Sequence, residues 1–355
     1  MARPERLSPP GDGGSPPAIV VALSGCADGP GRALALRLAA RPEVTVRPVD
    51  VEDPALADRL DGVDSVVLLD LGPAVAADLD DASGRAAAAE RLVSGARAVL
   101  GAAGRAGVPR VVLVTSAMVY GAAPDNPVPL DEDAPLRATP DGGLVAALLQ
   151  VEAEVERARA STPGLTVTVL RPAVLVGPGA NSVLTRHFEA PRLLVLKGSR
   201  PHWQFCHVDD LVTALELAAL GTAEGTLTVG CEGFLEQQRV EELSGLRRLE
   251  IPAVLAQATA GRLHRLGITP APEDELVYAA HSWVVPSARL RATGWTPRFD
   301  NETTLMELLA DIERRSAPGD RRFGTRAATL GAAGATVAVL GAAAIVRQLR
   351  QRRGI

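Results

Sequence analysis

Lysine and tyrosine are scarce in this sequence of 355 residues. The chain carries 37 basic side chains, and Lys197 is the only lysine among them. The two tyrosines are Tyr120 and Tyr278, and the residues four positions after them are Pro124 and Ser282. A mechanism that needs a tyrosine and a lysine four residues apart is therefore excluded.

Cysteine and histidine are also few. The three cysteines, at positions 26, 206 and 231, form no C-x-x-C pair, and the five histidines form no H-E-x-x-H motif. These absences argue against a disulfide scaffold and against the usual zinc motifs, so we expect no metal. The sequence also lacks G-x-S-x-G, which argues against a serine hydrolase.

Charge is divided unevenly along the chain, whose formal net charge is −5. Residues 321–355 hold seven arginines and no acid, so the rest of the chain carries the other 30 of the 37 basic side chains and all 42 acids. Aromatic residues make up only 3% of the chain, which leaves few surfaces for stacking on bases. An acidic body with few aromatics argues against nucleic acid as a partner, despite the basic tail.

The basic tail contains an uncharged stretch of 20 residues, Ala327–Val346. Its length fits a membrane span, but nine alanines and three glycines make it only weakly apolar. A weak anchor and an Ala-rich helix on a membrane or a partner therefore both remain open. A span would carry Arg347–Arg353 across the membrane against the positive-inside tendency. We therefore favour association of residues 321–355 with an anionic membrane surface.

Short apolar runs alternate with helical patterns after residues 1–17, a leader rich in proline, glycine and serine that we expect to be disordered. The expected strands are Ala18–Leu23, Val44–Val51, Ser65–Leu69, Arg110–Thr115 and Thr166–Leu170. The expected helices are Arg32–Ala40, Pro54–Leu60, Gly84–Ala106 and Asp141–Ala160. This alternation indicates an α/β fold, a Rossmann-type doubly wound parallel sheet, over residues 18–180.

The pattern loosens in the second half of the chain. Helical patterns lie at Val208–Leu220, Glu236–Leu243, Ile251–Leu266 and Leu305–Ile312, with a strand pattern at Thr226–Val229. We expect residues 181–318 to form a smaller α+β subdomain, of substrate-binding type, that is interleaved with the first domain. Residues 319–355 are the tail, with an apolar and basic C-terminal helix.

A glycine cluster follows the first expected strand. Gly25, Gly29 and Gly31 give the spacing G-x-x-x-G-x-G at the start of a helix. A dinucleotide pyrophosphate binds backbone N–H groups at such a helix N-terminus, where a Cβ would block its approach. The cluster therefore predicts a dinucleotide site, with a tight turn that holds no ligand as the alternative. Asp50, at the end of the next strand, is predicted to bind ribose or adenine, whereas Asp53 is interpreted as a helix cap.

Several segments in order resemble one protein family. They are Ser24–Gly31, Gly62–Val67, Gly107–Val112, Val114–Gly121, Leu170–Pro172, Val176–Pro178 and Phe205–Leu211. The chain resembles the short-chain dehydrogenase/reductase superfamily, in its extended, NAD-dependent epimerase/dehydratase type, over about residues 18–315. The resemblance implies NAD or NADP as cofactor and Ser116 as the serine of a Ser-Tyr-Lys catalytic set. It also implies that Arg171 faces the substrate cleft, with pairing to an acid as the alternative.

The sequence departs from that family where hydride transfer occurs. The family's Tyr-x-x-x-Lys falls near the start of the helix Asp141–Ala160, on Leu144 and Leu148 or, with a shift of two residues, on Ala146 and Gln150. None of these side chains has a phenol or an amine, so Tyr-dependent chemistry cannot run there. The interval between the glycine cluster and residue 63 is also short. It has room for one strand where the family has two, in the part that binds the adenosine ribose.

The remaining clusters have structural interpretations. His207, Asp209 and Asp210 suggest a metal site, but a cap for the helix that begins near Leu211 is favoured. The acids Asp131–Asp133 are interpreted as a solvated loop. Three aromatic residues are interpreted as core: Trp203, Phe205 and Trp283.

Two functions of different class remain. The first is a catalytically impaired, NAD(P)-binding, epimerase/dehydratase-like protein that binds a dinucleotide or small molecule as a sensor or scaffold. The second is an active oxidoreductase or nucleotide-sugar epimerase/dehydratase that uses non-standard residues. The absent tyrosine and lysine favour the first. Scattered cysteines indicate a cytoplasmic protein, with membrane association through the tail and a homodimer as open alternatives.

Overall fold

The structure is a computed structural model of the chain. It describes residues 19–27, 29–69, 82–139, 143–180, 182–190, 192–252 and 277–316. The predicted leader and tail, residues 1–17 and 319–355, lie outside these described residues. Among the described residues, no helix is both long enough and apolar enough to cross a membrane.

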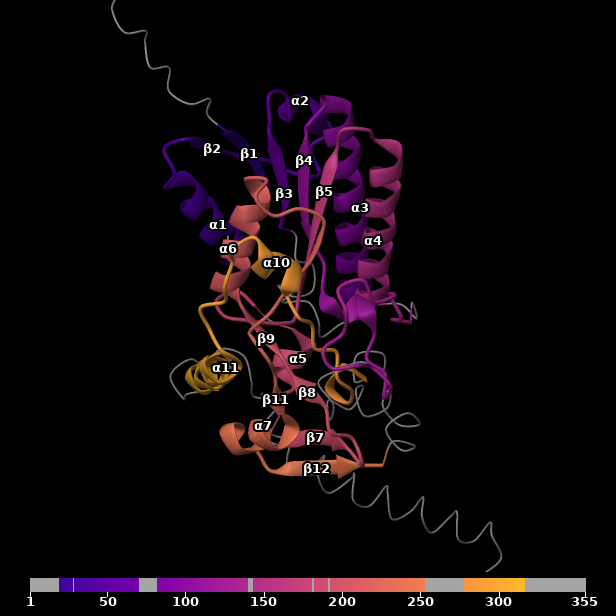
Figure 1. Ribbon diagram of the computed structural model, residues 1–355, viewed down its shortest axis with the longest axis vertical. Coiled ribbons are helices and arrows are strands. Elements are labelled where there is room, and N and C mark those ends of the chain that lie inside the picture. Colours follow the sequence, from indigo (N-terminus) through magenta and orange to yellow (C-terminus); the bar gives the residue numbers. More distant parts are fainter. Residues whose placement is uncertain are drawn as a thin grey trace, which may run out of the picture.

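Six parallel strands form the central sheet, in the spatial order β10-β5-β4-β3-β1-β2 (Figure 1). They are β1 (Ile19–Ser24), β2 (Val44–Pro48), β3 (Ser65–Leu68), β4 (Arg110–Val114), β5 (Thr166–Pro172) and β10 (Thr226–Val229). The strands β3, β4 and β5 are buried along almost their whole length, as expected where helices cover both faces of a sheet. The predicted Rossmann-type parallel sheet is confirmed.

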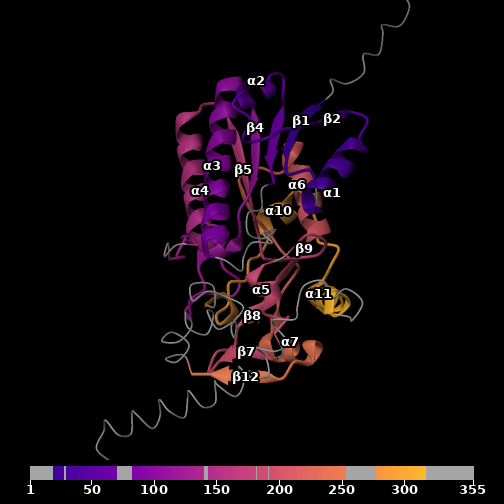
Figure 2. The same cartoon turned by 180° about the vertical axis from the view of Figure 1, so that it is seen from behind.

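Helices cover both faces of this sheet, as Figures 1 and 2 show. The four main ones are α1 (Gly29–Ala39), α3 (Ala82–Ala106), α4 (Gly143–Ser161) and α6 (Val208–Ala219). Along β1, Val21 and Leu23 pack in a cluster with α1 and α6, whereas Ala22 packs in a cluster with α3 and α4. This alternation follows because successive side chains of a strand point to opposite faces. The two clusters form the core of a doubly wound fold.

The strand order reverses beside β1. The chain runs from β1 to the edge strand β2, passes through the short helix α2 (Leu56–Arg59), and returns to β3 on the other side of β1. The prediction that only one strand fits between the glycine cluster and residue 63 is therefore confirmed. In open α/β sheets, ligands bind outside the carboxyl ends of the strands at such a reversal.

The second part of the fold is built from short strand pairs. They are β6 (Val174–Val176) with β9 (Phe205–His207), β8 (His202–Trp203) with β11 (Leu235–Glu236), and β7 (Leu193–Leu196) with β12 (Arg248–Ile251). The pairs β7–β12 and β8–β11 fill the lower half of Figure 1 together with α7 (Gln237–Ser244). The three aromatic residues predicted to be core, Trp203, Phe205 and Trp283, are buried there.

Helices and 3-10 turns complete this second part of the fold. The helices are α5 (Val183–Arg186), α10 (Ala288–Ala292) and α11 (Asn301–Ser316), with the 3-10 turns η2 (Ala117–Tyr120) and η3 (Val277–Ala279). Both α6 and β10 belong to the central sheet domain although they follow residue 181. The proposed domain boundaries stay predictions.

One predicted helix begins wrongly. Ile251 closes the strand β12, which pairs in parallel with β7, instead of opening a helix Ile251–Leu266. Residues 253–266 of that prediction lie outside the described residues. The alternating pattern of β12 is only four residues long and three of its residues are exposed, so the sequence carries too little periodicity to reveal it.

Candidate functional site

The glycine turn joins β1 to α1 at the reversal of the strand order. Gly25 has a φ of +68°, and a Cβ on it would lie 2.8 Å from the carbonyl oxygen of Leu69. A Cβ on Gly31 would lie 1.9 Å from the carbonyl oxygen of Gly25. The helix therefore packs against the turn at a distance that only glycine allows. These are two of the three roles that glycines have in a dinucleotide-binding turn.

The remaining glycine of the turn, Gly29, lies against another segment of the chain. A Cβ on Gly179 would lie 2.8 Å from the Cα of Gly29, whose own φ is +51°. Gly179 belongs to a tight turn after β6, in which the Ala180 N–H donates to the carbonyl of Gly177 over 3.0 Å. The backbone approach that Gly29 permits is thus made, in this structure, by residues 177–180.

The N-terminus of α1 suits an anion. Its first turn contains no acidic residue, and the free N–H groups of a helix N-terminus carry a partial positive charge. Pro30 removes one of those N–H donors. Gly25, Gly31 and the helix end therefore fit the pyrophosphate of a dinucleotide, with one donor fewer than the turn would otherwise offer, whereas the space at Gly29 is taken by residues 177–180.

Asp50 lies on the same edge, just after β2. It is exposed, and its Oδ1 accepts the N–H of Glu52 over 2.9 Å, which leaves the second carboxylate oxygen open. Its role toward ribose or adenine stays a prediction. The interpretation of Asp53 as a helix cap is wrong, because α2 begins at Leu56 with Ala55 as its N-cap and without a side-chain cap. Asp53 instead accepts the N–H of Ala55 over 2.8 Å in the turn before the helix.

Ser116 follows β4 at the same carboxyl edge of the sheet. Its hydroxyl oxygen accepts the N–H of Met118 over 3.2 Å and so caps the 3-10 turn η2. The side chain is half-buried, and its hydroxyl proton is not used in that bond. Ser116 is therefore positioned by the fold and keeps a donor.

Arg171 is buried in an ion pair. Its Nε and Nη2 donate to the two carboxylate oxygens of Glu152, each over 2.9 Å, and Thr115 donates to the same carboxylate over 2.8 Å. Its Nη1 donates over 2.9 Å to the hydroxyl of Tyr120, which in turn donates to the carbonyl oxygen of Glu132 over 2.8 Å. Arg171 thus has the acid partner that we weighed as its alternative, and its role at a substrate cleft stays a prediction.

Burial controls the chemistry of Tyr120. The side chain has no exposed surface, and burial raises the pKa of its phenol, while the charge of Arg171 opposes that shift. Its hydroxyl already makes two hydrogen bonds within the protein. Tyr120 is therefore a structural residue in this arrangement and not a free acid or base.

Glu132 was not recognised from the sequence, and the prediction of a solvated loop is wrong for it. Its carboxylate is buried, accepts the hydroxyl of Thr228 over 2.9 Å, and accepts the N–H of Arg289 over 2.9 Å. The partners lie 96 and 157 residues away in the chain, so no local pattern announces them. Glu152 could have been recognised from the sequence, because a carboxylate stands out on a row of helix positions that are buried.

The two alternative registers for the family's tyrosine and lysine lie on different faces of α4. Glu152 points to the end of β4, where it meets Thr115, whereas Glu154 pairs with Arg97 of α3 over 2.6 Å. Residues four apart share a helix face, so Leu148 and Leu144 lie on the row of Glu152. Gln150, in the other register, is exposed. The face of α4 toward the end of β4 is therefore apolar at both family positions.

His207 caps α6. Its Nδ1 accepts the N–H of Asp209 over 3.1 Å, and its Nε2 lies 3.0 Å from a carboxylate oxygen of Glu307. Asp210 accepts the N–H groups of Arg298 and Phe299. The interpretation as a cap is confirmed. Over the described ranges, no three histidine, cysteine or acidic side chains gather in a way that would hold a metal ion.

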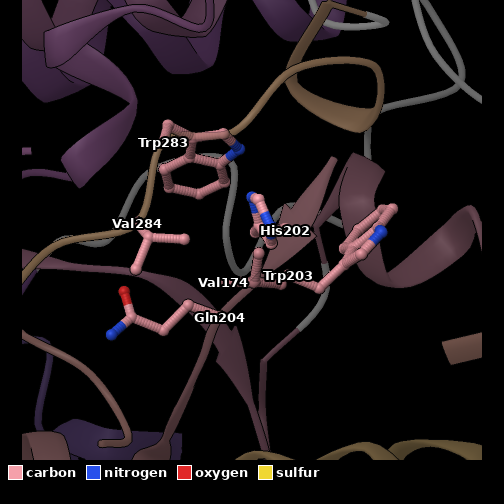
Figure 3. Close-up of a pocket in the computed structure, with 6 residues that line it drawn as sticks. All are labelled: Val174, His202, Trp203, Gln204, Trp283 and Val284. Carbon is pink, nitrogen blue, oxygen red and sulfur yellow. The ribbon is translucent and has the colours of Figure 1, made fainter. Parts of the chain in front are cut away.

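A small cavity lies in the second part of the fold (Figure 3). Its volume is about 10 Å³, and it is lined by Val174, His202, Trp203, Gln204, Trp283 and Val284. That is about the space of one water molecule. The amide nitrogen of Gln204 already donates to the carbonyls of Cys231 and Val285. The cavity is a gap in the packing and is too small for a cofactor or a substrate.

These features define a class of protein: a doubly wound α/β sheet with a glycine turn after its first strand is typical of Rossmann-type proteins. The family follows from a comparison. The model described as "NAD dependent epimerase/dehydratase family" matches residues 30–229, more than half of the chain. The protein therefore belongs to the NAD-dependent epimerase/dehydratase family, as its motifs predicted.

Individual relatives agree with this family. An uncharacterized protein of Mycobacterium tuberculosis is 29% identical over 255 residues, which are 70% of this chain and 66% of the relative, just under two thirds of its length. The structure of MoeE5 in complex with UDP-glucuronic acid and NAD is similar with a TM-score of 0.59, at 21% identity over 84% of this chain and 100% of that one. The human epimerase family protein SDR39U1 with NADPH has a TM-score of 0.59, at 19% identity over 82% and 99%. At such identities the solved structures support the fold alone.

Proposed function

We propose that this protein binds NAD or NADP at the glycine turn and does not catalyse Tyr-dependent hydride transfer, so that it acts as a ligand-binding sensor or scaffold. One observation carries the second half of this proposal. The row of α4 that faces the end of β4 bears Leu144 and Leu148, where the family resemblance calls for a phenol and an amine. Leucine neither donates nor accepts a proton.

The first half of the proposal rests on the turn itself. Gly25 and Gly31 have the close approaches of a dinucleotide-binding turn, and the first turn of α1 has no acid to repel a phosphate. Family members of similar fold are known with NAD or with NADPH, which supports either dinucleotide. A bound nicotinamide would supply or accept a hydride, but Leu144 and Leu148 offer no phenol or amine, and the Tyr120 hydroxyl is already bonded to Arg171 and Glu132.

Calorimetric titration of the full chain with NAD⁺, NADH, NADP⁺ and NADPH tests the binding. Gly29→Ala adds a Cβ to the turn and should weaken binding at least about tenfold, or 1.4 kcal/mol. Gly62→Ala is the matched control. Gly62 has a φ of +67° and open space around its Cβ position, so it has the same backbone penalty away from the turn. Absence of binding by all four dinucleotides, or equal affinity in Gly29→Ala and wild type, would contradict the proposal.

The alternative function is an active oxidoreductase or a nucleotide-sugar epimerase/dehydratase with non-standard residues. It is favoured by Ser116, whose hydroxyl keeps a free proton at the carboxyl edge of the sheet. Turnover of NAD(P)H with a panel of nucleotide sugars and small carbonyls distinguishes the two functions. A rate that is abolished by Ser116→Ala would establish the alternative, whereas binding without turnover supports the sensor.

A further inference from the structure

A second pocket lies at the end of β7, and it belongs to neither the glycine turn nor the edge with Ser116. Its volume is about 350 Å³, within the size range of small-molecule sites. Three segments line it: Ala123, Pro124 and Asn126 after η2, residues 196–200 at the end of β7, and residues 280–282. We call it the Lys197 pocket, because it contains the only lysine of the chain.

The Lys197 pocket has positive charge, and no acid is among the described residues that line it. Lys197 and Arg200 are both exposed at its rim, and neither has an ion-pair partner among the residues that the structure describes. The neighbouring acid Asp125 does not line the pocket, and Arg137 neutralises it over 3.0 Å. Lys197 and Arg200, without ion-pair partners among the described residues, form a local positive patch in a chain whose net charge is −5. Such a concentration of one sign attracts an anionic ligand.

Hydrogen bonds fix the walls of the pocket to one another. The hydroxyl of Ser199 donates to the carbonyl of Ala280, which ties the turn after β7 to the segment 280–282. The hydroxyl of Ser282 accepts the N–H of His202 over 3.0 Å. These contacts hold the pocket open in one shape, so little ordering is needed when a ligand binds.

Asn126 adds a polar group that lacks a partner. Its amide nitrogen donates to the carbonyls of Gly121 and Ser282, over 2.8 and 2.9 Å. These two bonds fix the orientation of the amide, since only its nitrogen can donate. The Oδ1 atom is then buried without a hydrogen bond within the described structure. A buried acceptor of this kind is stabilised when a hydroxyl or N–H reaches it.

We propose that the Lys197 pocket binds a small organic phosphate that also carries a hydroxyl or N–H group. Lys197 and Arg200 bind the phosphate, as a point charge and as a planar fork of donors. Asn126 accepts from the organic part of the ligand. Burial lowers the pKa of His281, another lining residue, so at neutral pH it adds a neutral N–H and no third charge. The proposal does not depend on dinucleotide binding at the glycine turn.

Calorimetry on the full chain at low salt tests the class of ligand. Ribose 5-phosphate carries both groups and should bind most tightly. Methyl phosphate lacks the hydroxyls and should bind more weakly, and ribose without a phosphate should not bind at the same concentrations. Malonate tests whether a carboxylate can replace the phosphate. Equal affinity for malonate and methyl phosphate would contradict the phosphate assignment, and so would the absence of any binding by ribose 5-phosphate.

Variants test the location. Lys197→Met and Arg200→Met should each weaken ribose 5-phosphate binding about tenfold, and the double variant should lose it. Arg247→Met is the matched control, because Arg247 is an exposed arginine that does not line the pocket. Binding retained by the double variant would overturn the proposal. Gly29→Ala should leave this affinity unchanged, and a loss there would assign the phosphate to the glycine turn instead.

Discussion

The buried pair of Arg171 and Glu152 allows a quantitative test of what holds the sheet domain together. The two side chains are 8% and 4% exposed and meet through two hydrogen bonds of 2.9 Å. We consider three variants, Glu152→Leu, Arg171→Met and the double variant. Each single variant leaves one buried charge without its partner, whereas the double variant replaces both charges with apolar side chains of similar size.

The magnitudes follow from burial. Removing one partner of a buried pair costs about 3–5 kcal/mol, because the remaining charge stays desolvated. The double variant removes both charges, so its remaining cost is two lost hydrogen bonds, from the Thr115 hydroxyl to Glu152 and from Arg171 to the Tyr120 hydroxyl, about 1 kcal/mol each. The double variant should therefore be more stable than either single variant, although it carries more changes.

Urea unfolding at pH 7, followed by the fluorescence of the three tryptophans, measures these differences. The control is Glu302→Leu, which breaks the exposed pair between Glu302 and Arg239, where both side chains are nearly half exposed. Such a surface pair contributes little. The reasoning is refuted if Glu152→Leu costs no more than Glu302→Leu, or if the double variant is destabilised by the sum of the two single variants.

Three further outcomes are expected. Gly31→Ala should prevent folding, seen as loss of the far-UV circular dichroism signal, because its Cβ would lie 1.9 Å from a carbonyl oxygen, whereas Gly62→Ala should fold. Burial lowers the pKa of His187 from 6.5 to about 4, so the native state excludes a proton that the unfolded chain binds. Stability should fall by about 3 kcal/mol as the pH drops from 6.5 to 4, and urea unfolding of His187→Phe should lack that component. For the tail, we expect the full-length protein in the membrane fraction and a chain that ends at Asp320 outside it. Full-length protein that stays soluble in low salt would contradict membrane association.

The central sheet could be predicted because its strands are continuous apolar runs between helices. For example, helices bury β4 on both faces, so the four residues after Arg110 are all apolar and stand out. The glycine turn could be predicted for a similar reason, since Gly25 and Gly31 occupy positions where any side chain would collide with backbone. In both cases a local requirement on residue type leaves a local signal.

The buried polar network could not be predicted, because its contacts are formed only by the tertiary fold. Glu132 lies between two other acids in a stretch without periodicity, and its burial depends on donors from Thr228 of β10 and from the N–H of Arg289. Strands such as β8 and β11 are two residues long, which is too short for an alternating pattern. Sequence periodicity cannot reveal elements that only pairing defines.

The face of α4 is compatible with the family fold when leucines occupy the row on which we placed the family's tyrosine and lysine. Leu144, Leu148 and Glu152 lie on one row, a turn apart from each other. Of these three residues, only Glu152 takes part in the ion pair that joins α4 to β5. Leu148 packs in the apolar cluster that also contains Leu113 and Val119, so a leucine there adds buried apolar contact. The ion pair and the two leucines therefore lie on different turns of one helix, and leucine at position 148 adds packing without disturbing the ion pair.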